Sequence, residues 1–322
     1  MKDIHVAFFT ESGYLRGMGH LVRTFTISEK FKSLGLKTSL FLDSNVSFDY
    51  KYEGITYFSW KDFKLIKGYD IIFIDSYEAD IEVYRRIANS CKVAVYVDDF
   101  RRLDYPEGVI LNFAPDADGL FYKRREEKHS YLLGLKYLPI RNEFIDAEIS
   151  KKEQIFIMLG GSDVANLSLD MVDALKDVTI KKIVVSDDIN TENLLKKYKD
   201  VEVLYKPSDT QLVKAMSSST MAISTASMSA YELSYLKIPS IIIAVAENQE
   251  IGAAQFIKYN IASDFISIKN NTWQDEIKNK TKRVLSHNSY YFSKKIDGNG
   301  AENQNNQSDS NSLLLRSLCA SK

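Results

Sequence analysis

The chain has 322 residues, and its 42 lysines and arginines nearly balance its 43 aspartates and glutamates, for a net charge of −1. Its 45% of apolar residues and 26% of charged residues are usual for globular proteins, which argues against a disordered chain. The balanced charge gives no global field for nucleic acid, and no apolar run reaches the ~18 residues of a membrane span. We therefore expect neither nucleic-acid binding nor stable membrane insertion.

The N-terminal residues and the two cysteines bear on the cellular compartment of the protein. Residues 1–9 are too short in apolar length to form a signal peptide. The two cysteines, Cys91 and Cys319, lie far apart in sequence, which suits a reduced protein better than a disulfide scaffold. We therefore expect a cytoplasmic protein.

Short apolar runs alternate with amphipathic stretches through the first half of the chain. The pattern predicts helices at 21–34 and 81–88, and strands at 4–9, 38–42, 71–75, 93–97 and 109–113. Continuous apolar strands that alternate with helices are typical of a parallel sheet covered on both faces.

The pattern breaks at 138–152, where Pro139 and a charged segment stand, and then restarts. A second set of strands is predicted at 154–159, 182–186, 201–205, 221–224 and 241–245. The fold class is therefore α/β, with two doubly wound Rossmann-like domains and a ligand in the interdomain cleft at the strand carboxyl ends. We expect domains at 1–140 and 154–302, a linker at 141–153, and a disordered tail at 303–322, with a short docked helix as the alternative for the tail.

A glycine-rich turn joins the first strand to the first helix. Gly17 and Gly19 allow the backbone to approach a ligand, and the helix N-terminus offers free N–H groups to an anion. His20 enters at the same turn, with an ordinary pKa near ~6.5 that suits a general base. A lone histidine is more often structural, but its place beside the glycines at a strand-to-helix turn favours a functional role. The third glycine of a dinucleotide fingerprint is missing, because Val22 fills its position.

Three further motifs follow strands of the second half. Gly160-Gly161 forms a turn that either binds phosphate or only caps a helix. Ser227, Met228 and Ser229 open a helix whose amides suit a diphosphate, and Glu232, one turn further on, suits the hydroxyls of a ribose. An ordinary serine cap with a glutamate in the first turn explains these residues equally well. Asn248 and Gln249 supply amide groups that suit sugar hydroxyls, although a plain polar turn explains them as well.

The sequence does not favour a metal site. Asp98-Asp99 and Asp187-Asp188 are adjacent pairs, and neighbouring side chains on an extended backbone point in opposite directions. No cysteine and histidine cluster has the spacing of a zinc site. We expect no metal and no cofactor.

Taken together, the motifs resemble those of the PseG-type nucleotide-sugar hydrolases of pseudaminic acid biosynthesis, which are relatives of the MurG-like GT-B glycosyltransferases. The resemblance extends over about residues 4–302. Its motifs occur in this order: Gly17-Met18-Gly19-His20-Leu21-Val22-Arg23, Ile74-Asp75-Ser76-Tyr77, Val97-Asp98-Asp99, Leu111-Asn112, Ile140-Arg141-Asn142-Glu143-Phe144, Leu159-Gly160-Gly161-Ser162-Asp163, Asn166-Leu167-Ser168-Leu169, Ser227-Met228-Ser229 with Glu232, Glu247-Asn248-Gln249-Glu250, and Ile296-Asp297-Gly298-Asn299-Gly300-Ala301.

The resemblance implies a GT-B fold and metal-independent hydrolysis of UDP-2,4-diacetamido-2,4,6-trideoxy-β-L-altropyranose to UDP and the free sugar. It implies that His20 activates a water that attacks the anomeric carbon with inversion, and that the first domain faces the sugar. The second domain would hold UDP. The implied substrate-binding residues are Gly17, Gly19, Tyr77, Asn112, Arg141, Gly160, Gly161, Ser227, Met228, Ser229, Glu232, Asn248 and Gln249.

The sequence departs from the family pattern at three places. Phe9 and Glu11 stand where the family has an R-x-D motif, Ser76 replaces the histidine of D-H-Y, and Asn303 replaces an arginine. The first two departures lie in the sugar-facing domain, so they bear on the identity of the sugar and leave UDP binding intact.

Two other functions fit the same motifs. A GT-B glycosyltransferase would share the donor site, since fold and donor do not determine the acceptor, and a lipid acceptor would call for an apolar, basic patch such as Phe121-Tyr122-Lys123-Arg124-Arg125. A nucleotide-sugar binding protein without turnover is the third interpretation, against which His20 argues. The sequence does not indicate an oligomeric state.

Overall fold

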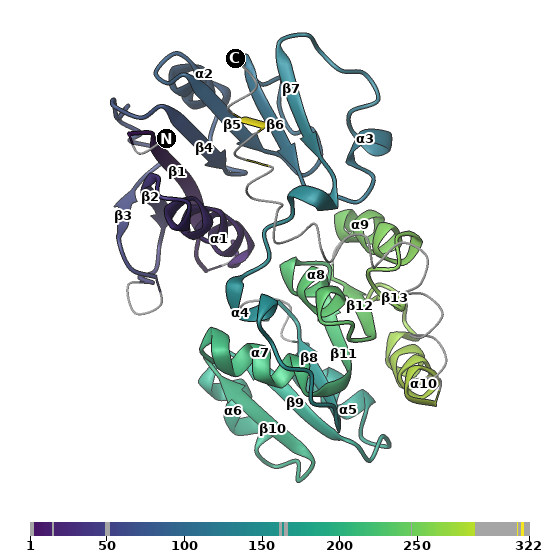
Figure 1. Cartoon of the computed structure of the whole chain (residues 1–322). Helices are drawn as coiled ribbons and strands as arrows, with labels where there is room; N and C mark the ends of the chain where they lie inside the picture. The colour runs from purple at the N-terminus through teal and green to yellow at the C-terminus, as the bar shows by residue number, and fades with distance from the viewer. Residues whose placement is uncertain are drawn as a thin grey trace. The chain divides into compact units, whose positions relative to one another are not determined.

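The computed structural model describes residues 3–14, 16–48, 52–160, 163, 167–245, 247–286, 314, 317 and 318. The chain divides into two compact units, each with its own sheet and core (Figure 1). Unit 1 comprises residues 1–139 and 305–322, and unit 2 comprises residues 140–304.

Unit 1 is built on a parallel sheet with the strand order β3-β2-β1-β4-β5-β6-β7. Its strands are β1 His5–Ser12, β2 Lys37–Ser44, β3 Ile55–Phe58, β4 Ile71–Asp75, β5 Val93–Val97, β6 Gly108–Asn112 and β7 His129–Leu133. Its helices are α1 Gly19–Ser33, α2 Ile81–Ala88 and α3 Ala117–Leu120, with a short 3-10 turn at Leu135–Tyr137. The strand order reverses between β1 and β4, and this reversal is the point at which doubly wound folds bind ligands.

The two faces of this sheet are covered in different ways. On one face α1 places Phe31 against Phe8 and Phe73, which alternate with residues that point to the other face. On the opposite face α2 covers β4 and β5, whereas β1 and β2 are covered by the connection 59–70, which contains no helix. Trp60 and Phe63 of this connection pack on Phe9 and fill the volume that a helix would occupy.

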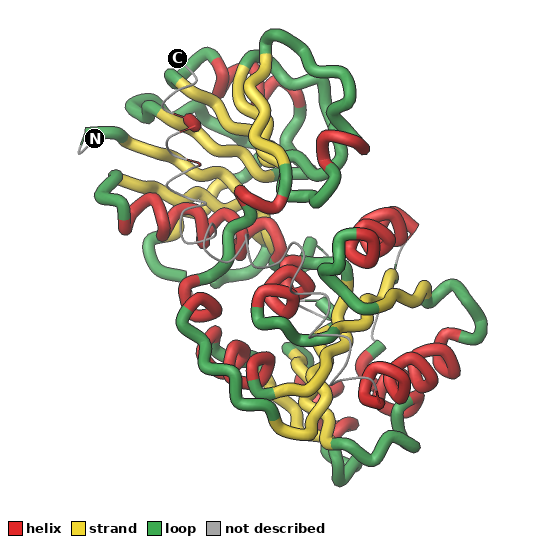
Figure 2. Tube along the Cα trace, turned by 45° about the vertical axis from the view of Figure 1, so that its right-hand side comes forward, coloured by secondary structure: helices red, strands yellow, loops and turns green. Residues whose placement is uncertain are grey.

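Unit 2 is a second parallel sheet, with the order β10-β9-β8-β11-β12-β13. Its strands are β8 Lys152–Met158, β9 Lys181–Ser186, β10 Val201–Tyr205, β11 Ser219–Thr225, β12 Ser240–Ala244 and β13 Asp264–Ser267. Its helices are α4 Asn142–Ile145, α5 Ser168–Ala174, α6 Ile189–Leu195, α7 Asp209–Ser217, α8 Met228–Tyr235, α9 Glu247–Lys258 and α10 Trp273–Ser286. The order reverses between β8 and β11, so both units have the doubly wound arrangement that the sequence predicts (Figure 2).

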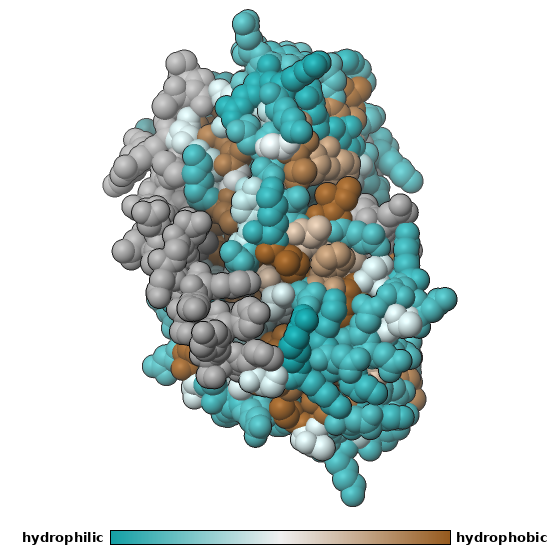
Figure 3. Space-filling view, turned by 90° about the vertical axis from the view of Figure 1, so that its right-hand side faces the viewer, coloured by the Kyte–Doolittle hydropathy of each residue, from teal (hydrophilic) through white to brown (hydrophobic). Residues whose placement is uncertain are grey.

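On the face shown in Figure 3, hydrophilic side chains cover most of the described surface, and apolar residues form smaller patches among them. Among the described residues no helix is long and apolar enough to cross a bilayer. In the tail that was predicted to be disordered, Leu314 and Leu318 are helical and buried within unit 1, as the alternative of a docked helix requires. Ser317 is also helical, and the other tail residues lie outside the described part.

Candidate functional site

The loop between β1 and α1 brings His20 to the carboxyl end of the sheet in unit 1. Gly17 adopts a φ of +74°, in the left-handed region that favours glycine. The Ser12 hydroxyl donates to the Gly17 carbonyl oxygen at 2.7 Å, which ties the loop back to the strand. Helix α1 then begins at Gly19, and no side chain caps its first amides. His20 therefore stands in the first turn of a helix whose N-terminus is open.

The carboxylate of Asp75 holds His20 in place. Asp75 ends β4, which pairs with β1, so its buried side chain reaches the start of α1. His20 Nδ1 lies 3.1 Å from Asp75 Oδ1, and the Thr24 hydroxyl donates to Asp75 Oδ2 at 3.0 Å. No described residue bonds His20 Nε2. With the proton of the neutral ring on Nδ1, the Nε2 lone pair is left to accept a proton.

Arg23 connects Asp75 to a second carboxylate. Its Nε and Nη2 atoms each donate to Asp75 at 2.6 Å, and Nη1 donates to Asp99 Oδ1 at 2.8 Å. The Tyr77 hydroxyl donates to Asp99 Oδ2, and the Tyr77 ring meets the His20 ring edge-on with centroids 4.4 Å apart. Bidentate pairing of this kind fixes both partners in one geometry. We call these five residues the His20 network: His20, Arg23, Asp75, Tyr77 and Asp99.

The charges of the network shift the pKa values of its members. Burial lowers the pKa of His20, but the charge of Asp75, its hydrogen bond to the ring and the charge of Asp99 together raise the pKa above its ordinary value of 6.5. Burial raises the pKa of Asp75, yet Arg23 and His20 hold it well below its usual range. Burial and Asp99 both raise the pKa of Tyr77. Burial raises the pKa of Asp99 as well, but Arg23 lowers it below its usual value. At neutral pH Asp75 and Asp99 are therefore ionised, and Tyr77 carries its proton.

Phe9 and Glu11 of β1, which stand where the family has its R-x-D motif, are both buried in unit 1. Phe9 is 1% exposed and stacks on Phe41 with ring centroids 4.6 Å apart, so it is a core residue. Glu11 accepts hydrogen bonds from Trp60 Nε1 at 2.9 Å and from the Tyr77 amide at 2.8 Å, and also from the Ser76 hydroxyl. Glu11 therefore fixes the backbone of the segment that carries Tyr77.

Asn112 ends β6 and is fully buried. Its Oδ1 atom accepts from the Ala114 amide at 2.7 Å, while its Nδ2 atom has no protein partner. The side chain thus shapes the turn after β6. Its role in binding substrate remains a prediction.

In unit 2, the residues predicted to bind a diphosphate follow two neighbouring strands. Gly160 comes after β8 with a φ of +94°, and a Cβ atom built on it would lie 4.0 Å from Thr225 Oγ1 at the end of β11. Ser227 precedes α8 in an extended conformation and makes no side-chain cap, which leaves the first amides of the helix to other partners. An uncapped helix N-terminus beside a glycine turn suits an anion.

The sugar-binding prediction after β12 is described in part. Gln249 lies in the first turn of α9, and its Oε1 atom accepts from the Val245 amide at 3.1 Å. Because β12 pairs with β11, Gln249 follows the strand next to the one that leads to Ser227. Gly161 and the side chain of Asn248 lie outside the described residues.

Arg141 and Glu232, both predicted to bind substrate, bind each other within unit 2. Arg141 Nε and Nη2 donate to the two carboxylate oxygens of Glu232 at 2.7 and 2.8 Å, and Nη1 donates to Asp209 at 2.8 Å. The Glu232 side chain is 1% exposed. These ion pairs connect the segment before α4 to α8 and α7. Because both carboxylate oxygens of Glu232 already accept from Arg141, a contact of Glu232 with ribose remains a prediction.

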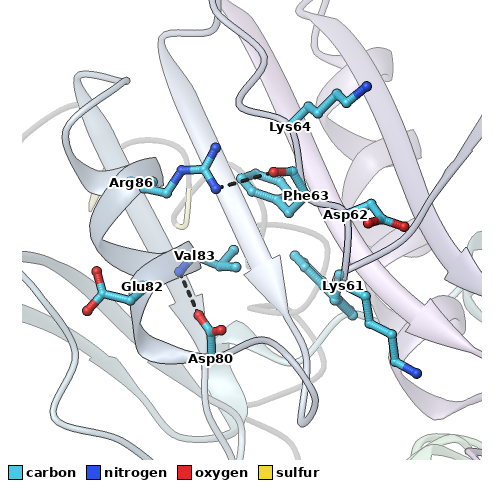
Figure 4. A pocket seen from close by; sticks show the side chains of 9 residues that line it. Lys61, Asp62, Phe63, Lys64, Asp80, Glu82, Val83 and Arg86 are labelled. Atoms are coloured by element: carbon cyan, nitrogen blue, oxygen red, sulfur yellow. Dashed lines mark hydrogen bonds between the residues drawn. The ribbon is translucent and has the colours of Figure 1, made fainter.

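A cavity of about 380 Å³ lies elsewhere in unit 1, and no predicted site residue lines it. Figure 4 shows it between the connection after β3 and the start of α2, with Arg86 directed at the Phe63 carbonyl oxygen. Asp80 accepts from the Val83 amide at 3.0 Å and so caps α2, while Lys61 and Lys64 extend away from Val83. Asp80 and Arg86, which line this cavity, are therefore engaged in hydrogen bonds that stabilise the fold of unit 1.

The two carboxylates of Asp98-Asp99 lie apart, as their adjacent positions in sequence predict. Asp98 accepts from the hydroxyls of Tyr105 and Tyr122 and from the Arg102 amide, whereas Asp99 pairs with Arg23. In the part of the chain that the structure describes, no three acidic, histidine or cysteine side chains are grouped so as to hold a metal ion.

Curated proteins with similar sequences include two that are named as UDP-sugar hydrolases. No family model matches the sequence. The chain is 26% identical over 84% of its length to the Helicobacter pylori "pseudaminic acid cytidylyltransferase and UDP-2,4-diacetamido-2,4,6-trideoxy-beta-L-altropyranose hydrolase". It is 24% identical over 79% of its length to the Campylobacter jejuni "UDP-2,4-diacetamido-2,4,6-trideoxy-beta-L-altropyranose hydrolase", of which it covers 96%. The chain is homologous to these hydrolases.

A third relative is the Bacillus subtilis "spore coat polysaccharide biosynthesis protein SpsG", 23% identical over 81% of the chain and 83% of the relative. The chain spans only about half the length of two of its curated relatives: 53% of the H. pylori protein and 56% of the Methanocaldococcus jannaschii protein MJ1062. The resemblance stated from the motifs is confirmed by these homologues.

Solved structures confirm the fold class. Acinetobacter baumannii MurG matches 98% of the chain and 99% of its own length, with a TM-score of 0.61 and 11% identity. The spinosyn rhamnosyltransferase SpnG, in complex with thymidine diphosphate, matches 97% and 99%, with a TM-score of 0.59 and 10% identity. The chain therefore has the two-sheet α/β fold of GT-B glycosyltransferases.

The interpretation of the sequence assigned no role to Asp75, Arg23 or Asp99, although all three stand in the quoted motifs. The signal for Asp75 was its position as a charged residue at the end of an apolar strand. What one sequence does not show is that β4 pairs with β1, which brings Asp75 to His20.

Proposed function

We propose that the protein hydrolyses a UDP-linked 2,4-diacetamido-2,4,6-trideoxy sugar to UDP and the free sugar, as a step toward a nonulosonic acid such as pseudaminic acid. The observation that carries the proposal is the pairing of His20 Nδ1 with buried, ionised Asp75, which leaves Nε2 to accept a proton. The names of the homologous hydrolases support the choice of substrate.

In the proposed reaction, a water oxygen forms a bond to the anomeric carbon while one of its protons passes to His20 Nε2. The bond between that carbon and the β-phosphate oxygen breaks, and UDP leaves with the electron pair. Asp75 stabilises the imidazolium that forms, in the manner of the carboxylate in a catalytic triad. A positioned base of this kind contributes roughly 10²–10⁴-fold to the rate.

The proposal assigns UDP to unit 2. The open amides at the start of α8, with Ser227, Met228 and Ser229, would meet the negative charge that develops on the diphosphate. Gly160 would leave room for the phosphates, and Gln249 would contact the sugar. Since the base belongs to unit 1 and the nucleotide to unit 2, turnover requires both units.

The charges around His20 favour hydrolysis over transfer to an anionic lipid. Arg23 pairs with two carboxylates, and Arg16 is also flanked by two, Asp43 and Glu78. This excess of negative charge suits a sugar that becomes positive in the transition state and repels an acceptor diphosphate. In the segment considered for a lipid acceptor, Tyr122 is buried and its hydroxyl donates to Asp98. A GT-B transferase with a neutral acceptor is the second candidate, supported by the solved neighbours.

The test is the release of UDP and free sugar from UDP-2,4-diacetamido-2,4,6-trideoxy-β-L-altropyranose, without acceptor and with EDTA present. We expect release by the wild type, a fall of roughly 10²–10⁴-fold in His20→Ala, and retained UDP binding in that variant. His5→Gln is the matched control, since His5 begins β1 at the opposite end of the strand. Bound UDP without any release would contradict hydrolysis and favour the transferase.

A further inference from the structure

Two aromatic side chains stand exposed beside the proposed base. Tyr77 follows β4 and Phe100 follows β5, and these strands are neighbours in the sheet. The side chains are 46% and 47% exposed, with ring centroids 5.5 Å apart. Since the Tyr77 ring is in T-shaped contact with the His20 ring, Tyr77 and Phe100 form a surface that starts at the base and extends away from it. We call it the Tyr77–Phe100 wall.

The polar groups next to this wall are bonded to one another. The Tyr77 hydroxyl donates to Asp99, and the Tyr77 amide donates to Glu11 at 2.8 Å. All three nitrogens of Arg23 donate to Asp75 or Asp99. The wall itself therefore offers a ligand aromatic carbon and no unused side-chain donor, because the Tyr77 hydroxyl is already bonded to Asp99. The uncapped first amides of α1 stand at His20 and not on the wall.

We propose that the Tyr77–Phe100 wall packs against a deoxygenated carbon of the donor sugar, and that Phe100 selects donors with a methyl group at C6 over donors with a hydroxymethyl group. The inference rests on the proposed function in that the ligand is the sugar of a nucleotide sugar. A methyl group gains contact with the rings as it leaves water. A hydroxyl at the same place gives up water and finds no partner on the wall.

The test compares two donors that differ only at C6: the 2,4,6-trideoxy donor above and UDP-2,4-diacetamido-2,4-dideoxy-β-L-altropyranose. Both kcat/KM and the dissociation constant are measured for the wild type, Phe100→Ala and Leu120→Ala. Leu120 is the control, because it is also exposed on unit 1, at 37%, and takes no part in the wall. We expect the wild type to prefer the 6-deoxy donor by roughly 10–200-fold, as one small group in an apolar site allows.

In Phe100→Ala we expect this preference to fall to within about twofold, through loss on the 6-deoxy donor alone, because the other donor gains nothing from the wall. Leu120→Ala should keep the wild-type preference. An equal loss on both donors, or an unchanged preference, would overturn the proposal. If UDP binds but neither donor is hydrolysed, the proposed hydrolysis fails, and the ratio of dissociation constants still decides for or against the wall.

Discussion

The side chain that bears most on function is Asp75, because it receives His20, Arg23 and Thr24 at once. A carboxylate that takes three partners in a buried place fixes each of them, and its loss leaves Arg23 with Asp99 alone. We expect Asp75 to determine both the orientation of His20 and much of the local stability.

Replacing Asp75 by asparagine tests this expectation. Asp75→Asn keeps the shape but removes the charge, so the pKa of His20 should fall, and UDP release should drop by roughly 10²–10⁴-fold. Breaking the buried pair with Arg23 should also cost about 3–5 kcal/mol of unfolding free energy. NMR titration of His20 and denaturant unfolding measure the two effects. Asp99→Asn, at a carboxylate that is 31% exposed, is the milder control. An unchanged pKa of His20 in Asp75→Asn would contradict this account.

The raised pKa of His20 also predicts how stability depends on pH. A group whose pKa is higher in the folded state contributes stability that is fully present below its unfolded pKa, near 6.5, and is lost as the pH rises through the folded pKa. The difference in Tm between wild type and His20→Gln should therefore be larger at pH 6 than at pH 9. A difference that grew with pH would show that folding lowers the pKa of His20, against the effect expected from Asp75.

At the scale of elements, the loop and first turn of α1 present a matched pair of glycines. Gly17 has a positive φ, whereas Gly19 begins the helix, and nothing lies within 4 Å of a Cβ atom at either position. Gly17→Ala should therefore destabilise the protein by about 1–2 kcal/mol through backbone strain alone. Gly19→Ala should be neutral or stabilise it by up to about 1 kcal/mol.

The KM of the Gly19→Ala variant tests whether a ligand approaches this turn. If a ligand approaches the open end of α1, Gly19→Ala should raise KM while its unfolding midpoint does not fall. Equal KM values in Gly19→Ala and the wild type would mean that the ligand does not approach this turn.

The pair of Arg141 and Glu232 joins the segment before α4 to helix α8. Arg141→Met leaves Glu232 buried without its main partner and should cost about 3–5 kcal/mol, while the double variant Arg141→Met/Glu232→Met should recover most of this loss. Denaturant unfolding measures both values. UDP titration of the double variant then tests the ribose contact: a loss of roughly 10–100-fold would support it, and unchanged affinity would leave Glu232 a structural role.

Some strands and helices can be predicted from the sequence alone, and others cannot. Apolar runs predict β4 and β5 at their observed bounds, and α2 as well, because a strand buried on both faces has an unmistakable composition. The same reasoning ends β1 at Phe9, three residues early, because Thr10, Glu11 and Ser12 look like a loop. They stay in the strand because Trp60 and the 76–78 segment satisfy Glu11. Strands β3, β7 and β13 are absent from the prediction.

For the molecule as a whole, the two units divide the proposed chemistry. The turns that carry His20, Gly160 and Ser227 were predicted from glycines and small polar residues after strands, and each follows a strand at the reversal of its sheet. Pairings across a sheet, such as that of Asp75 with His20, depend on strand order. Strand order is a tertiary property, so a single sequence does not contain that information in readable form.

In the proposed reaction, water activated by His20 attacks the anomeric carbon of the sugar. Turnover of the 6-deoxy donor in water enriched in ¹⁸O, followed by mass spectrometry of both products, tests it most directly. We expect the label to enter the free sugar and UDP to carry none. Label in UDP would show attack at phosphorus, and a reaction that needs an acceptor before UDP appears would show transfer. Either result would contradict the account.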